Sequence, residues 1–352
     1  MTSGRMTRGL RRAAVLAPLV GIVLQLGAGP VTADPAVPTH YRSTVTEVVD
    51  AEGDPVDLDV EVLGGDTYLV VEVPAGVEVE VPGYDDEPYI RFGSDGEVEV
   101  NQRSPARWLN DARYGSAEVD LPPSADAEAP PDWGLVSRSG TYAWHDHRIH
   151  FMSPRLPPQV DSSLDEVQEV WPWEVPLIVD GAEVVIHGEL AWVPGPGPVV
   201  PVLALIIATA VAVLAARSVG PDPLIGVAAL LTIALGVSSN LGLPPGADRL
   251  PALWVLPAVS IGVLLIGRML SRGDDLRGAV LRALSAVPPA GGAVLMIGAL
   301  VRPIVPGLFS PVTIRTIVIA ILALSIASLI VVVRQIWAST SLDREEPAVV
   351  VD

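Results

Sequence analysis

The chain divides into two parts with different patterns of hydrophobic and polar positions. Up to about residue 193 short apolar and polar runs alternate, and within residues 77–81 three valines alternate with two glutamates. A period of two predicts β-strands with one buried face and one wet face. After residue 198 the pattern changes to long apolar stretches, which predict helices that cross a membrane.

Turn signals separate the alternating runs of the first part. Asp180-Gly181, between the runs 174–178 and 182–192, is a two-residue hairpin signal. We therefore expect residues 34–193 to form an all-β domain with little helix, a sandwich of the immunoglobulin-like or cupredoxin-like kind. The other predicted strands are residues 43–49, 58–63, 67–73, 77–81, 89–92 and 97–100.

A linker of proline and glycine, residues 194–198, precedes the apolar part. Each apolar stretch after it approaches the ~20 residues that a helix needs to cross the hydrocarbon core of a bilayer. A cytoplasmic tail, residues 335–352, follows the last stretch. The expected transmembrane bundle of about five helices comprises residues 199–216, 223–242, 250–267, 280–301 and 315–333.

The arginines between these stretches predict the orientation, because cytoplasmic loops carry an excess of basic residues. Seven arginines fall on the side of the C-terminus and three on the other side. We therefore expect a multi-pass plasma-membrane protein with its N-terminal domain outside and its C-terminus in the cytoplasm. The seven are Arg217, Arg268, Arg272, Arg277, Arg282, Arg334 and Arg344, and the three are Arg249, Arg302 and Arg315.

Residues 1–33 have the order of a secretory signal peptide. Four arginines precede an apolar run from about residue 13 to 28, and small residues end at Ala33, before Asp34. A charged start, a short apolar core and a small-residue cleavage site predict export and cleavage. The alternative is an uncleaved anchor helix, for which the apolar run is short.

The charge is concentrated in the predicted exported domain. The whole chain has a net charge of −19, whereas residues 34–198 hold 33 acidic residues and 8 arginines, a sum of −25. Such a surface repels nucleic acid, which excludes that class of partner. The expected partners are the lipid bilayer and another membrane or exported protein. The chain contains no cysteine, so it has no disulfide framework.

The segment 142–152 holds three of the five histidines and is the most specific chemistry in the sequence. Residues two apart on a strand share a face at about 7 Å, so His145 and His147 are predicted to hold one metal ion together. His150 joins them only if the chain bends after Arg148. Imidazole and thioether ligands suit copper, and imidazole with a carboxylate suits zinc or copper(II). The candidate metal ligands are His145, His147, His150, Met152 and His187.

A structural role is the alternative for this segment, because Asp146 and Arg148 share the opposite face with Trp144 and can pair there. Five of the eight arginines of the domain lie in or near residues 101–114 and 142–155, which indicates a polar network or a concave binding site. The alternative is that they only neutralise an acidic domain. The candidate ligand-binding residues are Asn101, Arg103, Arg107, Asp146, Arg148 and Arg155.

No complete catalytic motif occurs in the chain. The patterns G-x-S-x-G, H-E-x-x-H, G-x-G-x-x-G and the P-loop are all absent, so we do not expect an enzyme. The first hypothesis is a membrane-anchored extracytoplasmic binding or accessory protein that recognises a ligand or partner through its His/Arg-rich surface. The second is copper or zinc binding for metal handling or sensing at the cell surface. The third is an extracytoplasmic enzyme of unknown reaction.

The segment YAWHDHRIHFM, residues 142–152, also carries a resemblance, together with NQRSPARWLNDARYG at 101–115 and the stretch 171–198. The chain resembles a family of actinobacterial membrane proteins with a signal peptide, an exported β-rich domain and C-terminal transmembrane helices. The resemblance covers most of the exported domain and implies no activity. All 22 basic residues are arginine, which is also typical of a GC-rich genome. A looser likeness, in architecture only, is to exported copper-handling β-sandwiches.

Overall fold

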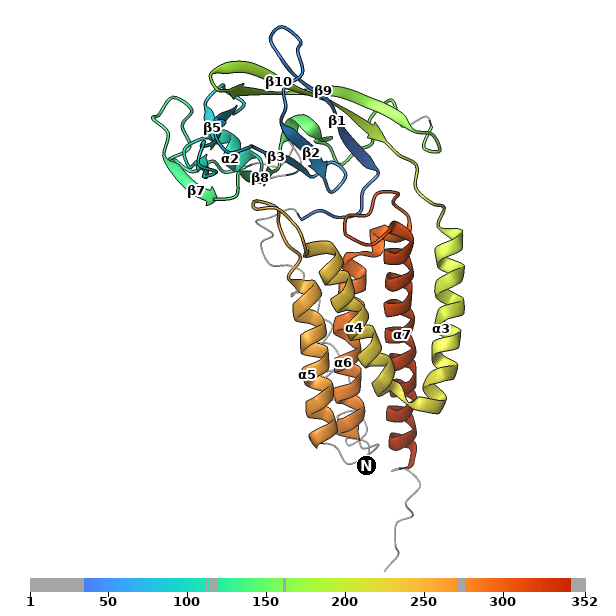
Figure 1. Cartoon of the computed structure of the whole chain (residues 1–352). Coiled ribbons are helices and arrows are strands. Elements are labelled where there is room, and N and C mark those ends of the chain that lie inside the picture. Colours follow the sequence, from blue (N-terminus) through green and yellow to red (C-terminus); the bar gives the residue numbers. More distant parts are fainter. Residues whose placement is uncertain (1–34, 112, 114–118, 161–162, 271–275, 343–352) are drawn as a thin grey trace, which may run out of the picture.

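Alternating residues in the N-terminal part form two antiparallel sheets. The computed structural model describes residues 35–111, 113, 119–160, 163–270 and 276–342, so the predicted signal peptide lies outside the described residues. The larger sheet has seven strands in the order β1-β10-β9-β4-β5-β6-β7, and the smaller has three in the order β2-β3-β8 (Figure 1). In the larger sheet the strands are β1 (Tyr41–Asp50), β4 (Val79–Pro82), β5 (Pro88–Phe92), β6 (Val98–Asn101), β7 (Trp133–Ser137), β9 (Gln168–Val179) and β10 (Ala182–Trp192). The smaller sheet consists of β2 (Asp59–Leu63), β3 (Tyr68–Glu72) and β8 (Thr141–Trp144).

The predicted hairpin at Asp180-Gly181 is confirmed. β9 and β10 pair antiparallel with Val179 opposite Ala182, and both turn residues have positive φ, 49° for Asp180 and 84° for Gly181. A two-residue turn of this kind matches the twist of its strands, and Asp-Gly adopts it at low steric cost. β9 and β10 are the two longest strands of the larger sheet.

One apolar core joins the two sheets. Leu69 and Val71 of the smaller sheet and Val81 and Ile90 of the larger are fully buried in the same cluster. Val79 and Val81 point inward while Glu80 between them is only half-buried, as the alternation of residues 77–81 predicted. The expectation of a β-rich N-terminal domain is therefore confirmed. Two short helical segments interrupt it, α2 (Pro105–Leu109) and η1 (His147–Ile149).

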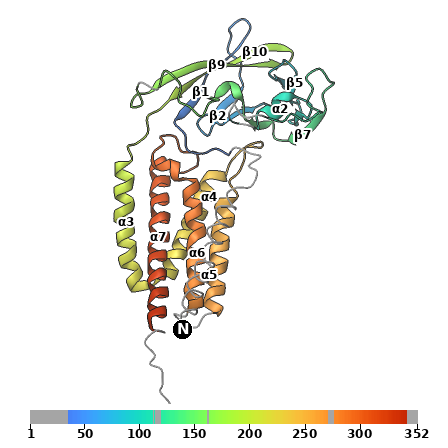
Figure 2. The same cartoon turned by 180° about the vertical axis from the view of Figure 1, so that it is seen from behind.

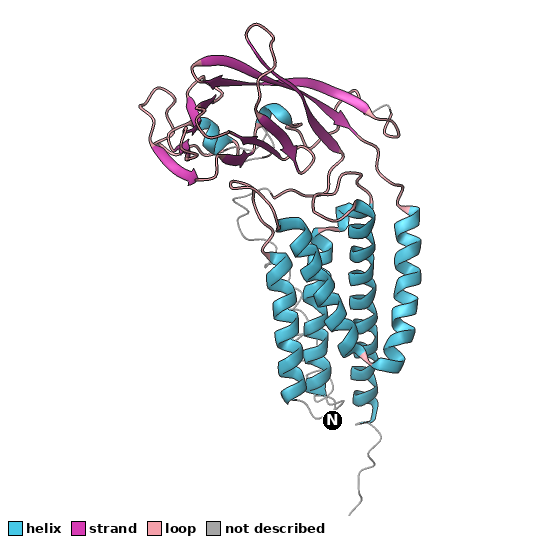
Figure 3. Ribbon diagram, viewed as in Figure 1, coloured by secondary structure: helices cyan, strands magenta, loops and turns pink. Residues whose placement is uncertain are grey.

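Within the described residues, the apolar part folds into five helices that are long and apolar enough to cross a membrane, as expected. Figure 3 shows them as a separate helical body beneath the sheets. The fourth ends earlier than the predicted stretch 280–301, because Met296 leaves helical geometry (φ −101°, ψ 10°) and a short 3₁₀ turn follows. The helices are α3 (Val199–Val219), α4 (Pro221–Asn240), α5 (Ala252–Leu270), α6 (Leu276–Leu295) and α7 (Pro311–Leu342), with the turn η2 (Ile297–Leu300) between α6 and α7.

Small residues allow the central helices to approach closely. A Cβ on Gly292 of α6 would lie 2.5 Å from Thr232 of α4, and one on Gly236 of α4 would lie 3.1 Å from Leu253 of α5. Close contact between backbones is what holds helices together in lipid, where the hydrophobic effect between them is absent. α3 lies at the edge of the bundle beside α7, which both views show (Figures 1 and 2).

The β domain rests on the loops at one end of the bundle. Thr39 and Ile304 exchange backbone hydrogen bonds of 3.0 and 3.3 Å, and the Ala143 amide donates to the Pro245 carbonyl at 2.8 Å. The buried residues Tyr68 and Ala143 pack against Ala247 of the loop between α4 and α5. The two parts are therefore joined by direct contacts as well as by the linker.

Candidate functional site

The histidine segment does not continue the strand that precedes it. β8 ends at Trp144, and the 3₁₀ turn η1 begins at His147, capped by Asp146, whose side chain accepts a hydrogen bond from the Arg148 amide at 3.0 Å. The prediction that one strand runs through both His145 and His147 is therefore wrong. A capping Asp competes with strand pairing, because its side chain satisfies an amide of the turn that follows.

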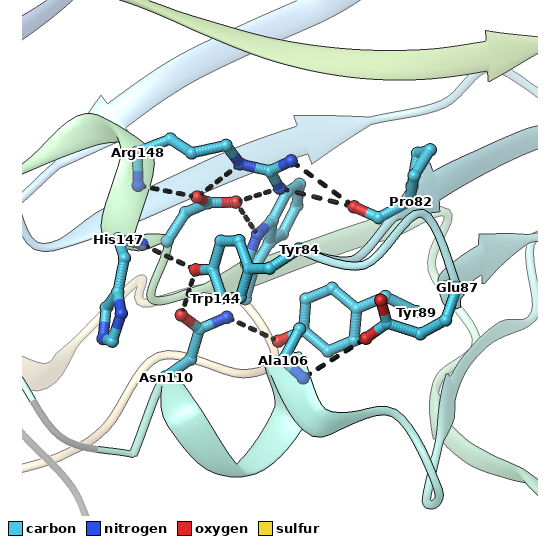
Figure 4. Close-up of polar contacts among 10 residues, drawn as sticks. Pro82, Tyr84, Glu87, Tyr89, Ala106, Asn110, Trp144, His147 and Arg148 are labelled. Carbon is cyan, nitrogen blue, oxygen red and sulfur yellow. Dashed lines mark hydrogen bonds and ion pairs between the residues drawn. The ribbon is translucent and has the colours of Figure 1, made fainter. Parts of the chain in front are cut away.

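Asp146 is the centre of a buried polar network, and its partners Trp144 and Arg148 are labelled in Figure 4. Its side chain is fully buried and accepts hydrogen bonds from Trp144 Nε1 at 2.9 Å and from Arg148 Nε and Nη2 at 2.8 and 2.7 Å. Burial alone would raise the pKa of the Asp146 carboxyl, but the charge and hydrogen bonds of Arg148 hold it below its usual value. The predicted pairing of Asp146 with Arg148 is confirmed, and it lies inside the domain.

Two tyrosines extend this network. The Tyr84 hydroxyl accepts a hydrogen bond from the His147 amide at 2.9 Å and contacts Asn110 Oδ1, and Asn110 Nδ2 donates to the Tyr89 hydroxyl at 3.2 Å. Burial raises the pKa of both tyrosines well above the ordinary value. The network thus connects η1, the end of α2 and β5 through neutral phenols and one ion pair, which is an arrangement that stabilises a fold (Figure 4).

The histidines of the segment face different surroundings. His145 packs on the Tyr68 ring at 4.4 Å, and its Nε2 lies 3.7 Å from Asp248 in the loop between α4 and α5. His150 is fully buried and donates from Nε2 to the Arg113 carbonyl at 3.0 Å. Burial, with the charge of Arg113, lowers the pKa of His150 to about 3, so this imidazole is neutral at physiological pH.

The remaining candidate metal ligands are spread over the domain. His147 lies against the Tyr84 ring at 5.7 Å and 5.4 Å from the His150 ring, and His187 of β10 lies 3.3 Å from Glu174 of β9. Met152 is half-buried. Among the residues that the structure describes, no group of three His, Asp or Glu side chains is arranged to hold a metal ion. Copper or zinc binding stays a prediction.

Three of the candidate ligand-binding residues have local partners. Asn101 is buried, and its Oδ1 accepts hydrogen bonds from the Arg103 and Asp132 amides at 3.0 and 2.9 Å. The Arg103 guanidinium donates to the Pro130 carbonyl at 3.3 Å, and the Arg107 guanidinium lies 4.3 Å from the Trp108 ring. These contacts shape the loops around α2.

Arg155 instead lines a cavity of about 520 Å³ between the β domain and the loops of the bundle, which we call the arginine cavity. Three arginines from distant parts of the chain line it, Arg113, Arg155 and Arg302. Arg113 follows α2, Arg155 follows η1, and Arg302 follows η2. Four aromatic rings line the same cavity, those of His40, Tyr41, Phe151 and Trp192.

The aromatic wall of the arginine cavity is preorganised. The His40 ring stacks on Trp192 at 4.3 Å with 8° between the planes, and Tyr41 lies 5.6 Å from Trp192 and 5.8 Å from Phe151. His40 donates from Nδ1 to the Val193 carbonyl at 3.1 Å, and burial lowers the pKa of its imidazole. The wall is therefore uncharged at neutral pH.

The charge of the arginine cavity is opposite to that of the domain. Arg113 pairs with the buried Asp66 at 2.7 Å, and Arg302 donates from Nη1 to the Pro38 carbonyl at 2.7 Å. Among the described residues, no carboxylate lies within ion-pair distance of Arg155 or Arg302. Asp111 is the acidic residue of the lining, and burial raises the pKa of its carboxyl.

The described residues thus form a β-rich domain on five membrane-compatible helices, with a cavity lined by three arginines where the two meet. No family model matches the chain, and no curated protein or solved structure matches it.

The sequence pointed to Arg113 and Arg155, which belong to the five arginines clustered near residues 101–114 and 142–155, but not to Arg302 or His40 as residues of the same cavity. Arg302 was used only to orient the helices, and His40 stood outside the histidine segment. The available signal was that Arg302 interrupts an apolar stretch between Val301 and Pro303 at the end nearest the β domain.

Proposed function

We propose that the protein is a membrane-anchored extracytoplasmic binding protein that holds an anionic ligand in the arginine cavity. The observation that carries the proposal is the convergence of three arginines from three chain segments on one cavity of about 520 Å³. Two of them, Arg155 and Arg302, lack a carboxylate partner among the described residues. In a domain with an excess of acid, this is a local inversion of charge.

The chemistry of the lining favours a phosphate or carboxylate. A guanidinium offers a planar set of donors that matches both anions, often with two parallel hydrogen bonds. The site is flanked by aromatic rings, and hydrogen bonds to charged groups contribute more where water is partly excluded. His40 contributes no charge near neutral pH, because burial lowers its pKa.

The wider assignment rests on sequence patterns. The arginine distribution supports an outside position for the β domain and a cytoplasmic C-terminus, and export through a signal peptide agrees with both. Two antiparallel sheets around one core are compatible with an immunoglobulin-like or cupredoxin-like sandwich, which we retain as a proposal. The actinobacterial family resemblance and a partner protein in the membrane are proposals of the same standing.

Anion binding by the purified full-length chain tests the function. Inorganic phosphate, pyrophosphate and citrate are titrated in turn while the melting temperature is recorded, because a ligand that binds only the folded state raises it. Arg155→Gln and Arg302→Gln should each raise Kd roughly ten- to a hundredfold, since a charge-assisted hydrogen bond contributes about 1.5–3 kcal/mol.

The matched control is Arg91→Gln, which removes an exposed arginine on β5 that pairs with Glu99 at 2.6 Å. This variant should bind like the unmodified protein. The absence of binding by every anion at millimolar concentration, or an equal loss in Arg91→Gln, would overturn the proposal.

A further inference from the structure

A separate apolar groove lies next to the arginine cavity and shares one lining residue with it, Arg302. It has a volume of about 340 Å³ and lies between the start of α3 and the turn η2. Arg302 lines both spaces and therefore stands at the boundary between the cationic cavity and the apolar groove. We call it the α3 groove, and its apolar lining consists of Pro198, Pro201, Val202, Leu205, Ile297, Leu300 and Val301.

The position of the α3 groove is set by the linker. Val199 starts α3 directly after residues 194–198, so the first turn of α3 stands at the level of the loops that carry the β domain. A Cβ on Gly195 would lie 1.9 Å from the Val301 carbonyl and 3.0 Å from His40, so the linker packs against one residue of each lining. α3 lies at the edge of the bundle beside α7 (Figures 1 and 2).

We infer that the ligand is an anionic lipid, with its phosphate headgroup in the arginine cavity and an acyl chain in the α3 groove. The inference rests on the proposed function, because it needs the cavity to bind an anion. Charge and apolar surface are arranged in the order of an amphiphile: cationic side chains above, Arg302 at the junction and aliphatic side chains below. A small soluble anion would bind in the cavity and make no contact with the groove.

The site differs from an ordinary lipid-facing surface. Val202 is 54 % exposed and Leu205 is half-buried, whereas Pro201 and Leu300 are buried, so the groove has side walls as well as a floor. Lower on the same helix, Val211 is 60 % exposed and does not line the groove. Val211 is therefore a matched exposed position on α3 outside the groove lining.

Alkyl phosphates test the inference without micelles. The full-length chain in lipid nanodiscs is titrated with inorganic phosphate and with butyl, hexyl and octyl phosphate. Burial of one methylene is worth about 0.8 kcal/mol, so each pair of methylenes that enters the groove should tighten binding roughly tenfold. Val202→Trp should abolish this dependence on chain length and leave the Kd for inorganic phosphate unchanged.

The controls separate the two proposals. Val211→Trp should keep the chain-length dependence, and Arg302→Gln should weaken phosphate and octyl phosphate alike. Phosphate binding with no gain from the alkyl chain, or an equal effect of Val202→Trp and Val211→Trp, would overturn the lipid and leave the anion site. The absence of binding by phosphate and by every alkyl phosphate would overturn both.

Discussion

Removal of the Asp146 side chain tests whether residues 144–148 serve to stabilise the fold. In Asp146→Ala, four hydrogen bonds are lost, one from Trp144 and three from Arg148, counting its amide. The Arg148 side chain is 19 % exposed, so its charge would remain largely buried without a counter-ion. Its other contacts, with the Pro82 carbonyl at 3.4 Å and the Tyr84 ring at 5.2 Å, do not neutralise it.

The expected loss in the free energy of unfolding is about 3–5 kcal/mol, which is the cost of breaking a buried ion pair by removing one partner. That is about a fifth or more of the total stability of an average domain of ~5–15 kcal/mol. A pH dependence accompanies it. The pKa of Asp146 is below 3.8 in the folded protein, so its stabilisation is present above that pH and is lost as pH falls through the folded pKa.

Urea unfolding of the full-length chain in detergent, followed by far-ultraviolet circular dichroism, measures this loss. The control is Glu97→Ala, which removes one partner of the exposed ion pair between Glu97 and Arg138. An exposed pair contributes about 0.2–1 kcal/mol, so the control should unfold close to the unmodified protein. If Asp146→Ala lost no more than Glu97→Ala, the structural role of the segment would be refuted.

Two further changes probe burial and docking. The pKa of His150 is about 3 in the folded protein and 6.5 in the unfolded chain, so acidification from pH 6.5 to 5 should lower the free energy of unfolding by roughly 2 kcal/mol. Urea titrations at the two pH values measure this loss, and His150→Gln should abolish the contribution of His150 to it. An unchanged pH dependence in His150→Gln would contradict it. Gly246 has φ +89°, and a Cβ added to it would lie 1.9 Å from the Ala143 carbonyl. Gly246→Ala should therefore separate the loop from β8 and accelerate proteolysis between α4 and α5. Gly262→Ala, in open space on α5, is the control, and equal proteolysis of the two variants would show that the contact does not hold the β domain.

The histidine segment shows where prediction from local pattern failed. Spacing by two residues placed His145 and His147 on one face, which holds only while the strand continues. The Asp146 cap ends strand geometry at that point, and burial of its carboxylate depends on Arg148, Trp144 and the core beneath them. The pairing with Arg148 was predictable because it is local.

The secondary-structure elements of this protein follow from local sequence patterns. Alternation at residues 77–81, the Asp180-Gly181 turn and the long apolar stretches are local properties, and each specifies a strand, a hairpin or a membrane-compatible helix through its own period. The tertiary structure alone decided the arginine cavity. Arg155 and Arg302 are 147 positions apart in the chain, and they share a cavity because Thr39 pairs with Ile304 and the β domain packs on the loops. Convergence of this kind depends on how whole elements pack, and hydrophobic periodicity does not encode that.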